Sequence, residues 1–395
     1  MRKSLIPIFL LFVAILAIGA YLVSCKQGNS SEITKVTPLN FKKEKKELLI
    51  NVDSVLKAIN APEKTVRIDS LMHVWQKKRG FNGTILVAQQ GIPIYKGAFG
   101  YADLKKKDTL TINSSFQLAS VSKQFTAVAI LQLYEKGKLS LDDTIQKFFP
   151  DFPYKGITIH QLLSHRSGLG NYTYFTDRKF PDNIPLSNMD IIQFMIQNKP
   201  GLYNLPNRKF NYSNTGYCVL AAIIEKISGM KFEKYMKINV FNPLNMNSTF
   251  IYNMSRDSVF PNMTFGYEAN NKKVLNNFLD GVVGDKNVYS SVEDLLKWDQ
   301  ALYSETLLKQ TTLDKAFTPT SPERKGNINY GYGWRTNLVN DSTKIVFHRG
   351  WWHGYNSFFS RMLKDKITII ILSNKTNKSI YNVSDLEEIL YSFKP

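Results

Sequence analysis

The chain has 395 residues, of which 43% are hydrophobic and 21% charged, and these proportions exclude a collagen-like, low-complexity or wholly disordered protein. Its 51 lysines and arginines against 32 aspartates and glutamates give a net charge of +19. This excess is spread thinly and accompanies no nucleic-acid-binding motif, so we expect no nucleic acid partner. The two cysteines and five histidines lack disulfide or zinc spacing, and we expect no metal and no cofactor.

The N-terminus has the pattern of an export signal. Two basic residues precede an uncharged apolar run, Leu5 to Val23, and Ser24 and Cys25 follow it. A small residue before a cysteine resembles a bacterial lipobox, in which the thiol is lipidated and becomes the mature N-terminus. We predict a lipoprotein signal peptide over 1–24 and a cell-envelope protein anchored to a membrane through Cys25, with the outer membrane or periplasmic face favoured. The alternative is an uncleaved helix, because the run could nearly span a bilayer.

The segments after the signal differ in composition. Residues 25–62 are polar and lysine-rich, which predicts a tether. We expect the folded domain over 63–395. Apolar residues at helical spacing predict a first helix over 65–78, and alternating residues predict two strands, 84–88 and 92–99.

The rest of the domain is helical in the middle and returns to strands at the end. Helices are predicted over 120–136, 188–197, 214–232 and 292–303, and later strands and a last helix over 344–347, 356–362, 367–372 and 384–393. Strands so far apart share a sheet only if the helices are an excursion from it. We therefore predict an α/β (α+β) fold: an antiparallel sheet of N- and C-terminal strands, flanked by helices, with an inserted, mostly helical lobe. A cleft where sheet and lobe meet is the expected place for a site.

The first chemical signal is the pair Ser120 and Lys123 at the start of an apolar helix. A lysine three residues after a serine lies one turn along the same face. Desolvation in this helix favours the neutral amine, which can take the serine proton. The spacing alone is weak, because it recurs at Ser54 and Ser228, where we interpret it as part of solvated helical faces.

Two further motifs follow in order, namely Tyr212-Ser213-Asn214 and His348-Arg349-Gly350. Ser-x-x-Lys, then Tyr-x-Asn, then a basic-x-Gly strand resembles the penicillin-recognising serine hydrolases, most closely their class C β-lactamase-like branch. Residues 157–169 resemble the "ITI-x-x-LLTHTSGL" segment of that family, and 289–298 resemble its "STA-x-DL-x-KW" helix. The resemblance implies a β-lactamase/transpeptidase-like fold.

The resemblance also implies a role for each matching catalytic residue. Ser120 would attack a carbonyl and form an acyl-enzyme, with Lys123 as the base or as a group that tunes it. Tyr212 would relay protons to the leaving group. Asn214 would bind both Lys123 and the amide of the substrate.

Three residues near the last motif are expected to bind substrate. His348 stands where many relatives have lysine, and its imidazolium would hold a substrate carboxylate, but only while protonated. Gly350 would leave the strand edge clear for the substrate backbone. The backbone N–H of Trp351 would complete an oxyanion hole with that of Ser120. The Trp351 and Trp352 side chains either line an apolar acyl pocket or pack internally.

The sequence thus predicts an exported serine hydrolase that acts on D-amino-acid peptides, amides or esters, like a D-Ala-D-Ala carboxypeptidase or esterase. Its partners would be a small-molecule or peptidoglycan-derived substrate and, through the lipid on Cys25, a membrane. One alternative is a true class C-like β-lactamase, which differs only in the rate of deacylation. Another is a non-catalytic peptidoglycan-binding or scaffold protein, against which the presence of Ser120, Lys123, Tyr212 and Asn214 argues.

Overall fold

A computed structural model describes residues 52–176, 179–181, 184–254, 260–323, 327–340 and 343–391. Residues from Ser54 onward form one compact unit. The predicted signal peptide, the lipidation site Cys25 and most of the predicted tether lie outside the described residues. Within the part of the chain that is described, no helix has the length and apolarity needed to cross a membrane.

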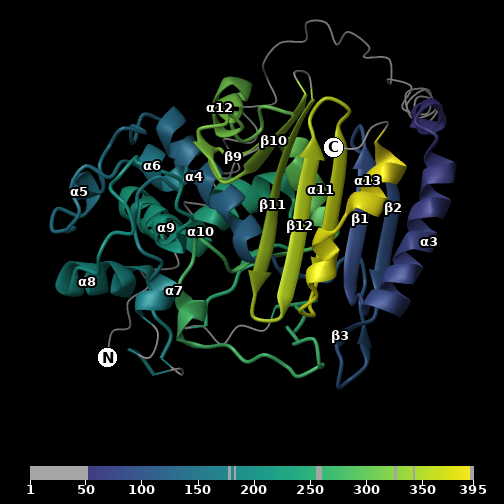
Figure 1. The fold of residues 1–395 in the computed structure, drawn as a ribbon, viewed down its shortest axis with the longest axis horizontal. Coiled ribbons are helices and arrows are strands. Elements are labelled where there is room, and N and C mark those ends of the chain that lie inside the picture. Colours follow the sequence, from purple (N-terminus) through teal and green to yellow (C-terminus); the bar gives the residue numbers. More distant parts are fainter. Residues whose placement is uncertain are drawn as a thin grey trace, which may run out of the picture. The chain divides into compact units, whose positions relative to one another are not determined.

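The unit is built on an eight-stranded antiparallel sheet in the order β2-β1-β13-β12-β11-β10-β9-β8 (Figure 1). Its strands are β1 Gly83–Gln89, β2 Ile92–Phe99, β8 Ser321–Pro322, β9 Ile328–Tyr330, β10 Arg335–Asn340, β11 Thr343–Trp352, β12 Tyr355–Met362 and β13 Ile367–Ser373. The N-terminal strand β1 pairs along its whole length with β13, from Gly83 opposite Ser373 to Gln89 opposite Ile367. This confirms the predicted sheet of N- and C-terminal strands.

Between β2 and β8 the chain forms the helical lobe and two small sheets. The helices from residue 61 onward are α3 Ala61–Arg79, α4 Ser122–Glu135, α5 Ile145–Phe148, α6 Ile159–Leu163, α7 Tyr172–Phe175, α8 Asn188–Asn198, α9 Asn214–Ser228, α10 Phe232–Met236, α11 Val292–Ala301, α12 Gln310–Ala316 and α13 Ser384–Leu390. Short helical turns are η1 Ala119–Val121, η2 Lys237–Phe241, η3 Asn242–Leu244, η4 Phe278–Gly281 and η5 Lys378–Tyr381, and the small strands are β3 Tyr101–Asp103, β4 Asp108–Thr109, β5 Phe116–Gln117, β6 Phe250–Ile251 and β7 Val288–Ser290.

The large sheet separates two hydrophobic cores. Helices α3 and α13 pack together over one face, where they bury Ile68, Trp75 and Leu386 (Figure 1). The larger core lies on the other face and extends into the helical lobe. Each fully buried large apolar side chain in these cores contributes roughly 1.5–3 kcal/mol relative to exposure.

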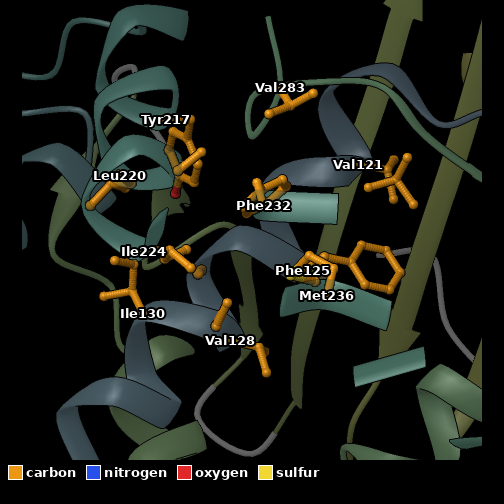
Figure 2. Close-up of a cluster of buried hydrophobic side chains, with 14 of the residues drawn as sticks. Val121, Phe125, Val128, Ile130, Tyr217, Leu220, Ile224, Phe232, Met236 and Val283 are labelled. Carbon is orange, nitrogen blue, oxygen red and sulfur yellow. The ribbon is translucent and has the colours of Figure 1, made fainter. Parts of the chain in front are cut away.

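Helix α4 lies at the centre of the larger core. Its residues are buried almost without interruption from Ser122 to Leu133, as expected for a helix that is apolar on every side. Figure 2 shows Phe125 and Val128 of α4 among side chains of α9 and α10, including Tyr217 and Met236. The buried environment of α4 fixes the position of the serine and lysine at its N-terminal end.

The folded body begins earlier than predicted. Residues 52–58 are helical, and Leu56 and Ile59 pack against the core under α3. The compact unit therefore starts at Ser54 rather than near Glu63, because two apolar side chains in an otherwise polar segment have a buried surface to cover.

Candidate active site

The segment that carries Ser120 is the short turn η1, which leads into α4. Ala119 has φ 48°, a left-handed conformation that an alanine adopts only when its surroundings enforce it. The enforcing neighbour is β11. A Cβ on Gly350 would lie 2.2 Å from the carbonyl oxygen of Leu118 and 2.3 Å from Ser357 Oγ. Glycine at this position therefore allows the serine-bearing turn to pack directly on the sheet.

Lys123 is fully buried and its ammonium nitrogen has three partners. Nζ lies 3.1 Å from Ser120 Oγ, 2.8 Å from Asn214 Oδ1 and 2.9 Å from the backbone oxygen of Asp285. The first two contacts bring together three residues that the sequence predicted for one site. The contact with Asp285 was not predicted, because no motif marks a backbone carbonyl as a partner.

Tyr212 lies beside two cations. Lys123 Nζ is 5.0 Å from the centre of its ring, and the guanidinium carbon of Arg335 is 5.4 Å from the same point. Arg335 belongs to β10 and forms a two-pronged ion pair with Glu323, with contacts of 2.7 and 2.9 Å. Burial opposes the charge of Arg335, but hydrogen bonding to Glu323 together with the nearby Tyr212 raises the pKa of Arg335, so this cation is permanent. Sequence reasoning missed it.

The structure contradicts the prediction for His348. Its ring is fully buried and is absent from the lining of the cleft. Nδ1 lies 2.8 Å from the carbonyl oxygen of Arg349, which requires a proton on Nδ1, and Nε2 accepts from Tyr330 at 3.0 Å. Burial, with Arg335 and Lys123 nearby, holds the pKa of His348 well below its usual value. The side chain is therefore a neutral imidazole buried behind the residues that line the cleft, and it is not an imidazolium that faces the substrate.

A second buried histidine supports the loop that carries Tyr212. The ring of His165 lies 4.2 Å from that of Tyr212, its Nδ1 accepts from the backbone N–H of Ser213, and its carbonyl accepts from Asn211. Burial and the nearby cations Lys123 and Arg335 hold the pKa of His165 well below its usual value. His165 is therefore a neutral side chain that holds this loop in place through hydrogen bonds and ring contact.

The structure has a cleft of about 690 Å³ beside Ser120. Ser120, Tyr212, Asn214, Gly350 and Trp351 line it, as the sequence predicted for a shared site, together with Tyr174, Arg335, Arg349 and Trp352. The Trp351 side chain is 56% exposed, and it lines the cleft rather than packing internally. Within the described residues, the Arg349 guanidinium pairs with no carboxylate; it lies over the rings of Phe347 and Tyr381.

Comparison with known proteins places the chain in a family. A profile of the β-lactamase family matches residues 68–390. Penicillin-binding protein 4* of Bacillus subtilis (strain 168) is 36% identical over 348 residues, which cover 83% of this chain and 76% of that protein. The chain belongs to the β-lactamase family. The family predicted from the three motifs is thereby confirmed.

Solved structures agree with this assignment. An octameric penicillin-binding protein homologue from Pyrococcus abyssi has a TM-score of 0.71 and 27% identity, covering 82% of this chain and 76% of that one. A D-amino acid amidase from Ochrobactrum anthropi SV3 has a TM-score of 0.68 over 79% of this chain and 94% of the amidase, and at 24% identity it shows the fold alone. This member of the β-lactamase family is a serine hydrolase of the β-lactamase and penicillin-binding-protein type, with the predicted fold.

Proposed function

We propose that Ser120 is the nucleophile of an acyl-transfer reaction on D-amino-acid peptides, amides or esters. The observation that carries this proposal is the 3.1 Å contact between Lys123 Nζ and Ser120 Oγ at the cleft. A buried lysine within hydrogen-bond reach of a serine hydroxyl is the arrangement that activates this otherwise weak nucleophile.

The proton steps follow from the positions of the side chains. As Ser120 Oγ bonds to the carbonyl carbon, its proton passes to the base formed by the adjacent Lys123 and Tyr212. Tyr212 passes this proton to the leaving amine or alcohol as the bond between that group and the carbonyl carbon breaks. In the second step water attacks the carbonyl carbon of the acyl-enzyme and gives one proton to the same base, which returns it to Ser120 Oγ as the ester bond breaks and the acid is released. The backbone N–H groups of Ser120 and Trp351 would stabilise the oxyanion in both steps.

The cationic groups of the cleft favour a substrate with an anionic end. Arg335 is tied to Glu323, whereas Arg349 has no carboxylate partner among the described residues. A guanidinium without a partner is suited to a carboxylate, which it can bind through two parallel hydrogen bonds. This assigns to Arg349 the role that the sequence had suggested for His348, and a peptide ending in D-Ala-D-Ala would present such a group.

The proposal is tested by labelling and by turnover. A fluorescent penicillin should form a covalent adduct that mass spectrometry places on Ser120. Ser120→Ala and Lys123→Ala should each reduce turnover of a short-chain ester by several orders of magnitude, because the two residues act as a unit. Ser228→Ala, in another Ser-x-x-Lys sequence that begins at the last residue of α9, is the matched control and should retain full activity.

The substrate panel separates the possible outcomes. A D-Ala-D-Ala peptide, its C-terminal amide, an ester and a penicillin should be compared by kcat/KM. Fastest turnover of the penicillin would favour the β-lactamase alternative. An adduct on another serine, or full activity without Ser120, would contradict the mechanism.

We also propose that the hydrolase is exported and held at a membrane by a lipid on Cys25. The support for this is the apolar run that ends at Cys25 and the start of the compact unit well after it, at Ser54. The enzyme would then meet its substrate in the cell envelope.

A further inference from the structure

One buried carboxylate holds the turn that follows Trp351. We propose that Asp280 is a positioning residue that sets the oxyanion-binding end of β11, an inference that rests on the proposed acyl-transfer function. Asp280 lies in the turn η4 and is 1% exposed. It is separate from the Ser120, Lys123 and Tyr212 cluster, and no motif of the sequence drew attention to it.

Asp280 contacts two consecutive side chains of the β11–β12 turn. Its Oδ1 accepts from the indole N–H of Trp352 at 2.7 Å, and its Oδ2 lies 3.0 Å from His353 Nδ1. The same Oδ2 accepts from the backbone N–H of Asn277 at 2.8 Å, which fixes the carboxylate within η4. Burial opposes ionisation, but the His353 contact and Lys286 hold the pKa of Asp280 below its usual value.

The turn needs such a support. Trp352 pairs with Tyr355, which leaves a two-residue loop in which His353 has φ 40° and Gly354 has φ 83°. Two successive left-handed residues form the tight hairpin that suits twisted strands, but histidine adopts this conformation at a cost of about 1–2 kcal/mol. The ring of His353 also stacks on Trp352, with ring centres 4.1 Å apart. Asp280 therefore stabilises the strained residue and its neighbour together.

The register of the hairpin links this turn to the oxyanion hole. Trp352 and Tyr355 close the hairpin, so Trp351 and Asn356 form the next pair, in which the backbone N–H groups point away from the partner strand. On that side β10 has already ended, because its first residue, Arg335, pairs with Phe347. The N–H of Trp351 thus faces an open strand edge at the cleft. A shift of the turn would move this donor away from the position of the oxyanion.

The test compares Asp280→Asn with a matched buried carboxylate, Asp299→Asn. Asp299 is as buried as Asp280 and pairs with Arg361 at 2.5 Å in the core, away from the cleft residues. Both variants should lower the melting temperature. Asp280→Asn should also lower kcat for a short-chain ester roughly 10- to 100-fold with little change in KM, less than the ~10²–10³-fold effect of removing an entire oxyanion donor. It should weaken inhibition by phenylboronic acid, whose serine adduct is tetrahedral, by a similar factor.

A second variant keeps the proposal testable if Asp280→Asn does not fold. Trp352→Phe removes the indole N–H but keeps an aromatic ring, and it should lower kcat in the same direction. If Asp280→Asn and Trp352→Phe change only the melting temperature, as Asp299→Asn should, Asp280 is merely structural and the proposal fails. Failure of the proposed function would look different, because the wild-type protein itself would then form no adduct on Ser120.

Discussion

The two histidines next to Tyr212 are unusual in being buried among cations. His165 and His348 both lie within 7 Å of the Tyr212 ring, centre to centre, and both are near Arg335 and Lys123. Any charge on either ring would be repelled by the neighbouring cations and poorly solvated. The site therefore keeps its positive charge on lysine and arginine and uses histidine as a neutral hydrogen-bonding group.

This arrangement predicts a specific loss of stability in acid. The folded-state pKa of each histidine lies below its unfolded value of ~6.5, so the unfolded chain takes up protons first as the pH falls. Stability from the neutral rings is fully present above pH ~6.5 and should decrease by up to about 1.4 kcal/mol per pH unit for each histidine below it. Urea unfolding of wild type and His348→Gln between pH 5 and 7.5 should show a shallower loss in the variant.

The control for this measurement is an exposed histidine. His73 lies on the surface of α3 with its side chain 62% exposed, and His73→Gln makes the same substitution outside the buried site. An unchanged slope in His348→Gln would mean that His348 is not held neutral in the folded protein.

At the scale of elements, the position of Ser120 depends on the contact between η1 and β11. Gly350 is the residue that permits this contact, since a Cβ there would meet Leu118 and Ser357 at well under van der Waals distance. The sequence predicted that Gly350 serves the substrate. The structure adds that it serves the turn that carries Ser120.

Gly350→Ala should therefore impair both stability and catalysis. Overpacking at this contact should cost about 1–3 kcal/mol of unfolding free energy. Displacement of Ser120 by even 1 Å should lower kcat/KM for an ester about 100-fold. Gly201→Ala is the matched control, because a Cβ there meets no atom within 4 Å. Equal activity of the two variants would rule out the role assigned to Gly350.

Long periodic elements were predictable from the sequence, and short polar ones were not. The strands β1, β2, β12 and β13 and the helices α4 and α9 follow from apolar runs of ordinary length. Strands β8 to β10 are short or polar, so no periodicity marked them, and Arg335 was missed with them. The burial of His348 was equally hidden, because the side on which a strand residue lies depends on register with neighbours that the sequence does not identify.

At the scale of the whole molecule, the described unit begins at Ser54, and the predicted anchor lies far before it. A chain that starts at Ser54 should be soluble and should keep the kcat/KM of the full-length protein. A chain that starts at Glu63 instead should be less stable, because Leu56 and Ile59 would be lost from the core.

The predicted anchor gives a separate test. The wild-type protein should fractionate with membranes, and Cys25→Ser should remain uncleaved or mislocalised. A soluble wild-type protein whose mature N-terminus lies well after Cys25 would contradict the anchor.

The pairing of β1 with β13 has a consequence for biosynthesis. The hairpin of β1 and β2 emerges early during translation, but an isolated hairpin is only marginally stable in water. The strand that pairs with the other side of β1 is β13, and it is made almost last, after the helical lobe and all the other strands of the sheet. Closing so long a loop is slow. The nascent chain therefore lacks a complete sheet until synthesis is nearly finished.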